Sequence, residues 1–355
     1  MQNNTFIKLL LSPISLLYGI GVGIKNLLYK YDVLKGVEFS LPVISVGNLT
    51  VGGTGKTPHI EYLIVLLKDY LNVATLSRGY KRKTEGFGYA ENFSTAEEVG
   101  DEPLQFKLKF PNVTVAVGEA RMFAIPQIVG DFPDTQVILL DDAFQHRSVI
   151  PSLNILLTTF DNPFTKDHLL PSGRLREWRS GYERADVIIV TKCPNDITSA
   201  QKSQYLKDIN PKPNQKVFFS YYKYGNPYYL FDPEYQIELE DTIDASLICA
   251  LANSKYLVDY LENTIQSTQI LEFSDHHYFS EKELDNLRIH FEGIQSERKI
   301  ILTTEKDAMR LLLHHEYLKQ HQLPIFVLPI DVAFHFEEGE QFDAYIKDFL
   351  LNFKV

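Results

Sequence analysis

The stretch that most limits how this chain can fold is GNLTVGGTGKTP, residues 47–58. A β-branched run, PVISVG, leads into it at residues 42–47, and an amphipathic segment, HIEYLIVLLKDYL, follows at residues 59–71. A strand that passes through a glycine-rich loop into a helix is the arrangement in which main-chain N–H groups bind phosphate. The sequence therefore predicts an α/β domain built around a phosphate-binding loop (P-loop).

Within this loop each residue type has a chemical role. The glycines permit positive φ angles and a close approach of the backbone to a ligand. Lys56 is expected to reach the β- and γ-phosphates of a nucleotide, and the Thr57 hydroxyl to bind Mg²⁺. The usual opening glycine is replaced by Thr50, so the loop is a variant. The predicted nucleotide-binding residues are Thr50, Val51, Gly52, Gly53, Thr54, Gly55, Lys56 and Thr57.

Short β-branched runs recur along the chain between segments with helical patterns. Buried parallel strands have this composition, and their alternation with helices favours a parallel sheet covered by helices on both faces. The runs lie at residues 42–47, 72–77, 113–118, 136–142, 153–159, 186–192, 246–252, 299–307 and 324–330.

The domain organisation follows from length and from changes in composition. A chain of 355 residues favours two domains. Residues 218–241 are rich in aromatic and turn residues, which indicates a junction. We expect an N-terminal membrane-associating helix at 1–34, a P-loop domain at 35–215, a linker with an antiparallel β-ribbon at 216–240, and a smaller C-terminal α/β domain at 241–355.

The N-terminal segment is apolar. Residues 9–24 carry no charge, but this run of 16 residues is shorter than the ~20 that span a bilayer. Aromatic and cationic residues follow, of the kind found at lipid headgroups. We expect residues 4–31 to form a helix that lies in one membrane leaflet. A helix packed on the domain core is the alternative, because such helices can be equally apolar.

Charge and cysteine content exclude some classes of function. The net charge of −11 argues against non-specific nucleic-acid binding, which depends on a cationic surface. Cys193 and Cys249 have neither metal-ligand spacing nor a disulfide pattern, so we expect two reduced core thiols. No sequence feature points to an obligate protein partner.

An acidic sequence element accompanies the glycine-rich loop. The run VILLDDAFQH, residues 137–146, ends a predicted strand in Asp141 and Asp142. Carboxylates at the end of a strand beside a P-loop are where Mg²⁺ is held.

A guanine-reading motif is not expected after residues 190–192, because Pro194 stands where an aspartate is needed.

Six motifs occur in order over nearly the whole chain: GNLTVGGTGKTP, SRGYKRK, GDEP, DDAFQH, GRLRE and TTEKDA. Together they resemble the tetraacyldisaccharide 4′-kinase family, in which a threonine at the loop's opening is normal. The resemblance implies transfer of the γ-phosphate of ATP, with Mg²⁺, to the 4′-hydroxyl of a tetraacyldisaccharide 1-phosphate, giving lipid IVA. It also implies a membrane-associated enzyme on the cytoplasmic face of the bacterial inner membrane.

The same resemblance assigns roles to site residues. Asp101 would take the proton of the sugar hydroxyl, and His276 would orient Asp101 or tune its basicity. Separately from the resemblance, we expect closure of the two domains to bring His276 towards Asp101 and to exclude water. His277 is adjacent and leaves the choice of histidine open. Lys56 is the third predicted catalytic residue. Basic clusters at 78–83 and 174–179 suit an anionic lipid substrate. The predicted substrate residues are Arg78, Arg121, Gln145, His146, Arg174 and Arg176.

Two other functions fit a P-loop chain. A regulatory or metal-delivery NTPase would carry a guanine-reading motif or a metal-binding cluster, and the sequence shows neither. A non-enzymatic membrane scaffold would tolerate a degenerate loop, whereas Lys56, Thr57 and Asp141 are all present.

Overall fold

The computed structural model describes residues 5–354. Contacts divide the chain into two compact units, and neither is continuous in sequence. The first unit comprises Met1–Arg78, Gly118–Tyr222 and Val332–Val355, and the second comprises Gly79–Val117 and Lys223–Asp331. This division differs from the expected boundaries: residues 79–117, assigned above to the P-loop domain, group with the C-terminal half of the chain.

The first unit is built on a parallel sheet. The strands run in the order β8-β7-β6-β1-β5-β2, and every neighbouring pair is parallel. Most of their side chains are buried, as expected for strands covered on both faces. The strands are β1 (Val43–Asn48), β2 (Val73–Ser77), β5 (Val137–Asp141), β6 (Leu153–Thr159), β7 (Val187–Thr191) and β8 (Lys216–Tyr224). The predicted α/β fold is confirmed.

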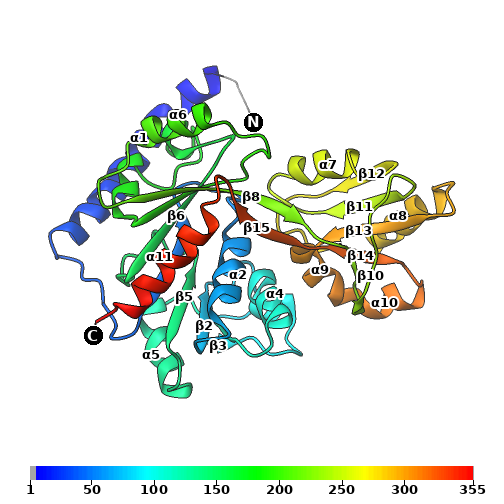
Figure 1. The fold of residues 1–355 in the computed structure, drawn as a ribbon, viewed down its shortest axis with the longest axis horizontal. Helices are drawn as coiled ribbons and strands as arrows, with labels where there is room; N and C mark the ends of the chain where they lie inside the picture. Colours follow the sequence, from blue (N-terminus) through cyan, green and yellow to red (C-terminus); the bar gives the residue numbers. More distant parts are fainter. Residues whose placement is uncertain (1–4, 355) are drawn as a thin grey trace. The chain divides into compact units, whose positions relative to one another are not determined.

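Helices cover both faces of this sheet. The Phe218 ring of β8 lies 5.3 Å from that of Phe342 in α11 (Gly339–Leu351), and the neighbouring Phe219 ring lies 6.2 Å from that of Tyr205 in α6 (Ser199–Ile209). Successive side chains of a strand point to opposite faces, so α11 and α6 lie on opposite sides of the sheet (Figure 1). The first unit also includes α2 (Lys56–Leu67), α5 (Arg121–Asp131), α6 (Ser199–Ile209), α11 (Gly339–Leu351), the short helices η1 (Phe164–Lys166) and η2 (Arg179–Arg184), and most of β15 (Ile330–Phe334).

The second unit has its own mixed sheet, in the order β10-β9-β14-β13-β11-β12. Strands β14, β13, β11 and β12 are parallel, whereas β9 and β10 are antiparallel. The strands of this sheet are β9 (Tyr228–Tyr229), β10 (Asp232–Gln236), β11 (Asp244–Cys249), β12 (Ser267–Glu272), β13 (Lys299–Thr304) and β14 (Ile325–Leu328). The second unit also includes β3 (Gly88–Tyr89) and β4 (Thr114–Val117), which are not strands of this sheet. Its helices are α3 (Ala96–Val99), α4 (Asp101–Lys109), α7 (Lys255–Glu262), α8 (Glu281–Gly293), α9 (Glu305–Leu311), η3 (Leu312–His314) and α10 (His315–Gln320).

The aromatic stretch near the junction is only partly a ribbon. Residues 216–224 form β8, which pairs in parallel with β7, and only the short strands β9 and β10 form an antiparallel pair. Phe218 and Phe219 of β8 are therefore buried beneath α11 and α6, and they do not belong to an isolated hairpin. Both cysteines are free and buried, as predicted.

The N-terminal helix α1 spans Thr5–Lys30; its predicted start at residue 4 lies outside the described residues. One face packs on the segment at 169–178, where the Trp178 indole N–H donates to the Gly19 carbonyl at 2.8 Å. A side chain at Gly19 would collide with Leu169 and Trp178, so glycine is required for this close approach. The helix thus contacts its own unit through one face and exposes an apolar face elsewhere.

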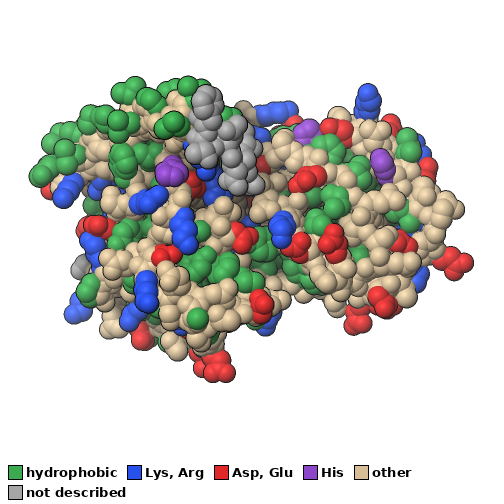
Figure 2. Space-filling view, turned by 90° about the horizontal axis from the view of Figure 1, so that it is seen from above, with side chains coloured by type: hydrophobic (Ala, Val, Ile, Leu, Met, Phe, Trp, Pro, Cys, Tyr) green, Lys and Arg blue, Asp and Glu red, His purple; other side chains and the backbone are tan. Residues whose placement is uncertain are grey.

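The exposed face of α1 is extensive. Figure 2 shows hydrophobic side chains gathered on one part of the surface. Residues 7–30 are long and apolar enough to cross a membrane by length and composition, and only 11% of the most apolar window is buried. The exposed large apolar residues of α1 are Ile7, Leu9, Leu10, Ile14, Leu16, Leu17, Tyr18, Ile20, Ile24 and Leu27.

A buried histidine makes the stability of the first unit depend on pH. His59 of α2 contacts the Gly55 carbonyl at 2.7 Å and the Ser220 hydroxyl at 3.0 Å. Burial lowers its pKa to about 4, against a small opposing effect of the Gly55 hydrogen bond. The unfolded chain therefore binds a proton below about pH 6.5 that the native state does not, so stability falls as the pH decreases towards 4.

We expect this histidine alone to cost about 2 kcal/mol of unfolding free energy between pH 7 and pH 5. Trp178 is the only tryptophan, so its fluorescence during urea unfolding reports on the first unit. The variant His59→Asn should lose about that much of the pH dependence. An equal pH dependence in both proteins would contradict this assignment.

Candidate active site

The P-loop residues adopt the conformation that the glycines permit. Gly52 and Gly55 have φ angles of 108° and 87°, which side chains rarely allow. A Cβ at Gly55 would also lie 2.3 Å from the Tyr222 hydroxyl. Helix α2 begins at the next residue, Lys56, so its first N–H groups and the positive end of its dipole face the loop.

Thr50 is explained by its partner across the loop. It is buried and forms an antiparallel bridge with Leu175, in which the Val51 N–H donates to the Arg174 carbonyl at 2.8 Å. The Arg176 N–H donates in turn to the Leu49 carbonyl at 2.7 Å. Extended backbone of this kind accepts any side chain, so the opening position does not need a glycine.

Hydrogen bonds from side chains of the sheet also hold the P-loop. The Thr191 hydroxyl, at the end of β7, donates to the Thr54 carbonyl at 2.8 Å. The Asn48 amide donates to the Thr54 hydroxyl at 2.9 Å, and both side chains are buried. These bonds fix the middle of the loop before any ligand binds, which lowers the entropy cost of binding.

Asp141 and Asp142 lie beside the loop, as predicted. In the parallel register Val46 of β1 is opposite Asp141, so both strands end at the same edge of the sheet. Arg176 Nη1 lies 2.9 Å and 3.0 Å from the two carboxylate oxygens of Asp142, and Lys56 Nζ lies 3.7 Å from one of them. Burial alone would raise the pKa of Asp142, but the charges of Lys56 and Arg176 lower it.

The buried side of this edge holds Arg121. Its side chain is 1% exposed and donates to the Asp141 carbonyl at 3.4 Å and the Glu119 carbonyl at 3.3 Å. Burial lowers the pKa of Arg121 to about 10, and burial followed by the charge of Arg121 lowers the pKa of His146 to about 4. His146 is therefore neutral at physiological pH and offers a polar but uncharged surface.

The other predicted substrate residues have different surroundings. Gln145 donates to the Asn48 carbonyl at 2.8 Å and to Glu177 at 3.0 Å, so it braces the start of the loop. Arg174 pairs with Asp167 at 2.9 Å. Arg78 is exposed directly after β2. Of the arginines at 174–179, Arg176 is the one directed to the acidic pair.

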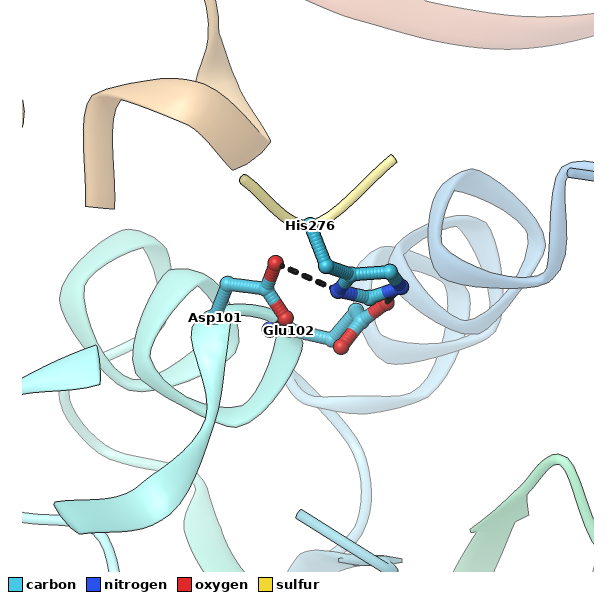
Figure 3. A group of neighbouring side chains, drawn as sticks. All are labelled: Asp101, Glu102 and His276. Atoms are coloured by element: carbon cyan, nitrogen blue, oxygen red, sulfur yellow. Dashed lines mark hydrogen bonds and ion pairs between the residues drawn. The ribbon is translucent and has the colours of Figure 1, made fainter. Parts of the chain in front are cut away.

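The second unit brings Asp101 and His276 together. Their Oδ2 and Nδ1 atoms are 2.9 Å apart, and Asp101 is 3% exposed (Figure 3). Asp101 is the first residue of α4, where the helix dipole favours a negative charge. His276 has a φ angle of 58° in the turn after β12, which directs its ring at the start of α4. Since both belong to one unit, no closure of two units is needed to form this pair.

His277 faces a different acid. Its Nε2 atom lies 3.0 Å from both carboxylate oxygens of Glu283, and its ring stacks on Phe273 at 4.8 Å. This histidine therefore stabilises the start of α8. The structure pairs His276, and not its neighbour, with Asp101.

Two cations to which no sequence pattern points lie beside this pair. Arg310 is fully buried and donates from Nη1 to Asp101 Oδ2 at 3.0 Å. Lys306 Nζ lies 3.0 Å from Glu102 Oε1 and 3.0 Å from His276 Nε2. Lys306 belongs to the TTEKDA motif, one of the six motifs that carry the family resemblance. Its position two residues after the N-cap Thr304 gives no sign of its partners.

The charges of this cluster are strongly coupled. Burial would raise the pKa of Asp101, but hydrogen bonds with Glu102 and His276 and the charge of Lys306 lower it well below its usual range. Burial and then the charge of Asp101 raise the pKa of Glu102. Burial opposes the charge on Lys306, yet Glu102, Asp101 and Asp275 together raise its pKa. Asp101 is thus an anion at physiological pH.

A metal ion does not suit this second cluster. One ligand atom each of Asp101, Glu102 and His276 lie within 4.8 Å of one another, which is close enough to hold an ion. However, the cationic groups of Lys306 and Arg310 already contact these ligand atoms. Binding a further cation would have to displace them.

Comparisons with known proteins agree over the whole chain. A family model described as tetraacyldisaccharide-1-P 4′-kinase matches residues 7–350. The tetraacyldisaccharide 4′-kinase of Bacteroides thetaiotaomicron is 42% identical over 349 residues, covering 95% of this chain and 91% of that protein. That of Parabacteroides distasonis is 43% identical over 344 residues, covering 95% and 93%.

A solved structure is similar as well. The crystal structure of the "apo" form of LpxK from Aquifex aeolicus, in complex with ATP, aligns with a TM-score of 0.72 and 29% identity, covering 97% of this chain and 99% of that one. These matches confirm the resemblance drawn from the six motifs. The chain belongs to the tetraacyldisaccharide-1-P 4′-kinase family.

Proposed function

We propose that Mg-ATP bound at residues 50–57 donates its γ-phosphate, and that Asp101, assisted by His276, receives the proton of the acceptor hydroxyl. As a member of its family the chain catalyses the ATP-dependent phosphorylation of the 4′-position of a lipid A precursor. The acceptor in this proposal is a tetraacyldisaccharide 1-phosphate and the product is lipid IVA. The observation that carries the proposal is the hydrogen bond of His276 to Asp101 at the start of α4.

The loop supports triphosphate binding in three ways. Its glycine conformations open the backbone to a ligand, the dipole of α2 favours an anion, and Lys56 adds a mobile positive charge. The contact of Lys56 with Asp142 is long, at 3.7 Å, and its side chain is 16% exposed. The ammonium can therefore turn to a phosphate oxygen at little cost.

The acidic pair fits a magnesium ion. Carboxylate and hydroxyl oxygens are the ligands that Mg²⁺ prefers, and Asp141 and Asp142 end a strand beside the loop that carries Thr57. In this proposal Thr57, Asp141 and Asp142 hold the ion, directly or through water. Bound there, Mg²⁺ would neutralise charge on the phosphates.

Asp101 suits a base that accepts the proton of the acceptor hydroxyl late in phosphoryl transfer. The transition state of phosphoryl transfer is loose, so the attacking hydroxyl needs orientation more than early deprotonation. A carboxylate with a lowered pKa stays ionised and can accept a hydrogen bond from that hydroxyl throughout. His276 holds the carboxylate in place. In-line transfer requires the γ-phosphorus and this hydroxyl to meet in the reacting complex.

The exposed face of α1 supports association with a membrane. Its apolar side chains and the Lys25 and Lys30 side chains near its C-terminal end suit a helix lying at the lipid surface. We place the enzyme on the cytoplasmic face of the bacterial inner membrane, where ATP and an acylated acceptor are both accessible. Arg78, which is exposed, is the predicted substrate residue most open to an anionic group.

Replacing Lys56 with alanine should reduce turnover on the order of 10²–10³-fold, because a charge aimed at the transferred phosphoryl group is lost. The assay measures transfer of labelled phosphate from ATP to the disaccharide 1-phosphate in detergent micelles. Lys68→Ala, at the exposed end of the same helix, is the matched control and should retain turnover. Equal activity of the two variants would remove Lys56 from the site.

The variant Asp101→Asn should lower kcat on the order of 10²–10⁴-fold, the usual contribution of a general base, while ATP affinity stays the same. Glu297→Gln changes an exposed acid of the same unit and serves as the control. If the unmodified protein hydrolyses ATP but transfers no phosphate to the disaccharide, a regulatory NTPase would be favoured instead.

Chelation with EDTA should abolish transfer, and added Mg²⁺ should restore it. In Asp141→Asn the Mg²⁺ concentration for half-maximal activity should rise by roughly 10- to 100-fold, as mutations around a metal typically cause. An unchanged magnesium requirement would show that the ion is held elsewhere.

A further inference from the structure

The second ring nitrogen of His276 has a partner that the proposed reaction does not use. Lys306, from α9, places its Nζ atom 3.0 Å from His276 Nε2. The carboxylates nearby are too distant to replace it: Glu102 Oε1 and Asp275 Oδ1 both lie 3.8 Å from the same nitrogen. Lys306 is itself held by Glu102 at 3.0 Å and by Asp275 at 3.5 Å.

An ammonium group has three donors and no acceptor, so Nε2 must accept the hydrogen bond with its lone pair. A neutral imidazole whose Nε2 accepts carries its proton on Nδ1, and Nδ1 lies 2.9 Å from Asp101 Oδ2. We propose that Lys306 is a positioning residue, which fixes His276 as the neutral tautomer that donates from Nδ1 to Asp101.

This tautomer decides which oxygen of Asp101 faces the substrate. Oδ2 accepts from His276 Nδ1 and from Arg310 Nη1 at 3.0 Å, so both of its lone pairs are used. Oδ1 accepts from the Glu102 backbone N–H at 3.1 Å, and it is the oxygen of Asp101 to which we assign the acceptor hydroxyl. The assignment of Oδ1 rests on the proposed role of Asp101 as the base, whereas the tautomer itself does not.

The opposite tautomer would break both contacts. With its proton on Nε2, the ring would direct an N–H at the ammonium of Lys306 and a lone pair at the carboxylate of Asp101. Like charges and lone pairs at about 3 Å repel strongly where water is excluded. The side chain of His276 is 11% exposed and that of Asp101 3%, so solvent relieves little of this repulsion.

The test is ¹⁵N nuclear magnetic resonance of histidine-labelled full-length protein in detergent micelles at neutral pH. Resonances of His276 are assigned by their loss in His276→Gln. We expect the unmodified protein to show a protonated Nδ1 and an unprotonated Nε2. In Lys306→Met the Nε2 atom should gain a proton and kcat should fall at least tenfold, with KM for ATP unchanged.

Two further variants separate this role from general stability. Lys306→Arg keeps a donor without an acceptor and should preserve the ring pattern, whereas Lys282→Met, an exposed lysine of the same unit, should change nothing. A protonated Nε2 in the unmodified protein would overturn the proposal, and so would an unchanged ring in Lys306→Met. If Lys306→Met does not fold, the spectrum of the unmodified protein still decides.

The outcomes also distinguish this proposal from the proposed function. The expected tautomer together with full turnover in Asp101→Asn would leave the role of Lys306 in place and refute the role of Asp101 as the base. A protonated Nε2 in the unmodified protein together with a large loss of turnover in Asp101→Asn would leave Asp101 as the base. It would refute the positioning role of Lys306.

Discussion

The first unit depends on the parallel pairing of β1 with β5. That register ends both strands at one edge, which sets the P-loop beside Asp141 and Asp142. A shift of register would separate the loop from the acidic pair, because each residue of a strand advances about 3.3 Å. The site therefore inherits its geometry from hydrophobic strand pairing, and the bridge of Thr50 with Leu175 only refines it.

In the second unit, a buried carboxylate has to stay ionised. Asp101 is surrounded by His276, Arg310 and the backbone N–H of Glu102. Burying charges is expensive, and a close, fully paired cluster offsets that expense only when its geometry is well defined. Such a cluster adds little net stability, but it holds the carboxylate in one orientation. That orientation is what a catalytic base needs.

Sequence reasoning succeeded where one local pattern decides the structure. The β-branched runs at 42–47 and 136–142 became β1 and β5, and the glycine-rich loop lies between strand and helix as expected. It failed where distant segments meet. The grouping of 79–117 with the C-terminal half depends on the packing of α4 against α9, and Arg310 reaches Asp101 through that packing. No local pattern encodes such contacts.

The central claim is that the carboxylate of Asp101 receives the acceptor's proton. Its most direct test is a structure of the enzyme with a non-hydrolysable ATP analogue and the disaccharide 1-phosphate. The account predicts the 4′-hydroxyl oxygen within about 3.2 Å of an Asp101 carboxylate oxygen, with the γ-phosphorus on its other side. A 4′-hydroxyl bonded to another base, with Asp101 contacting only protein groups, would contradict it.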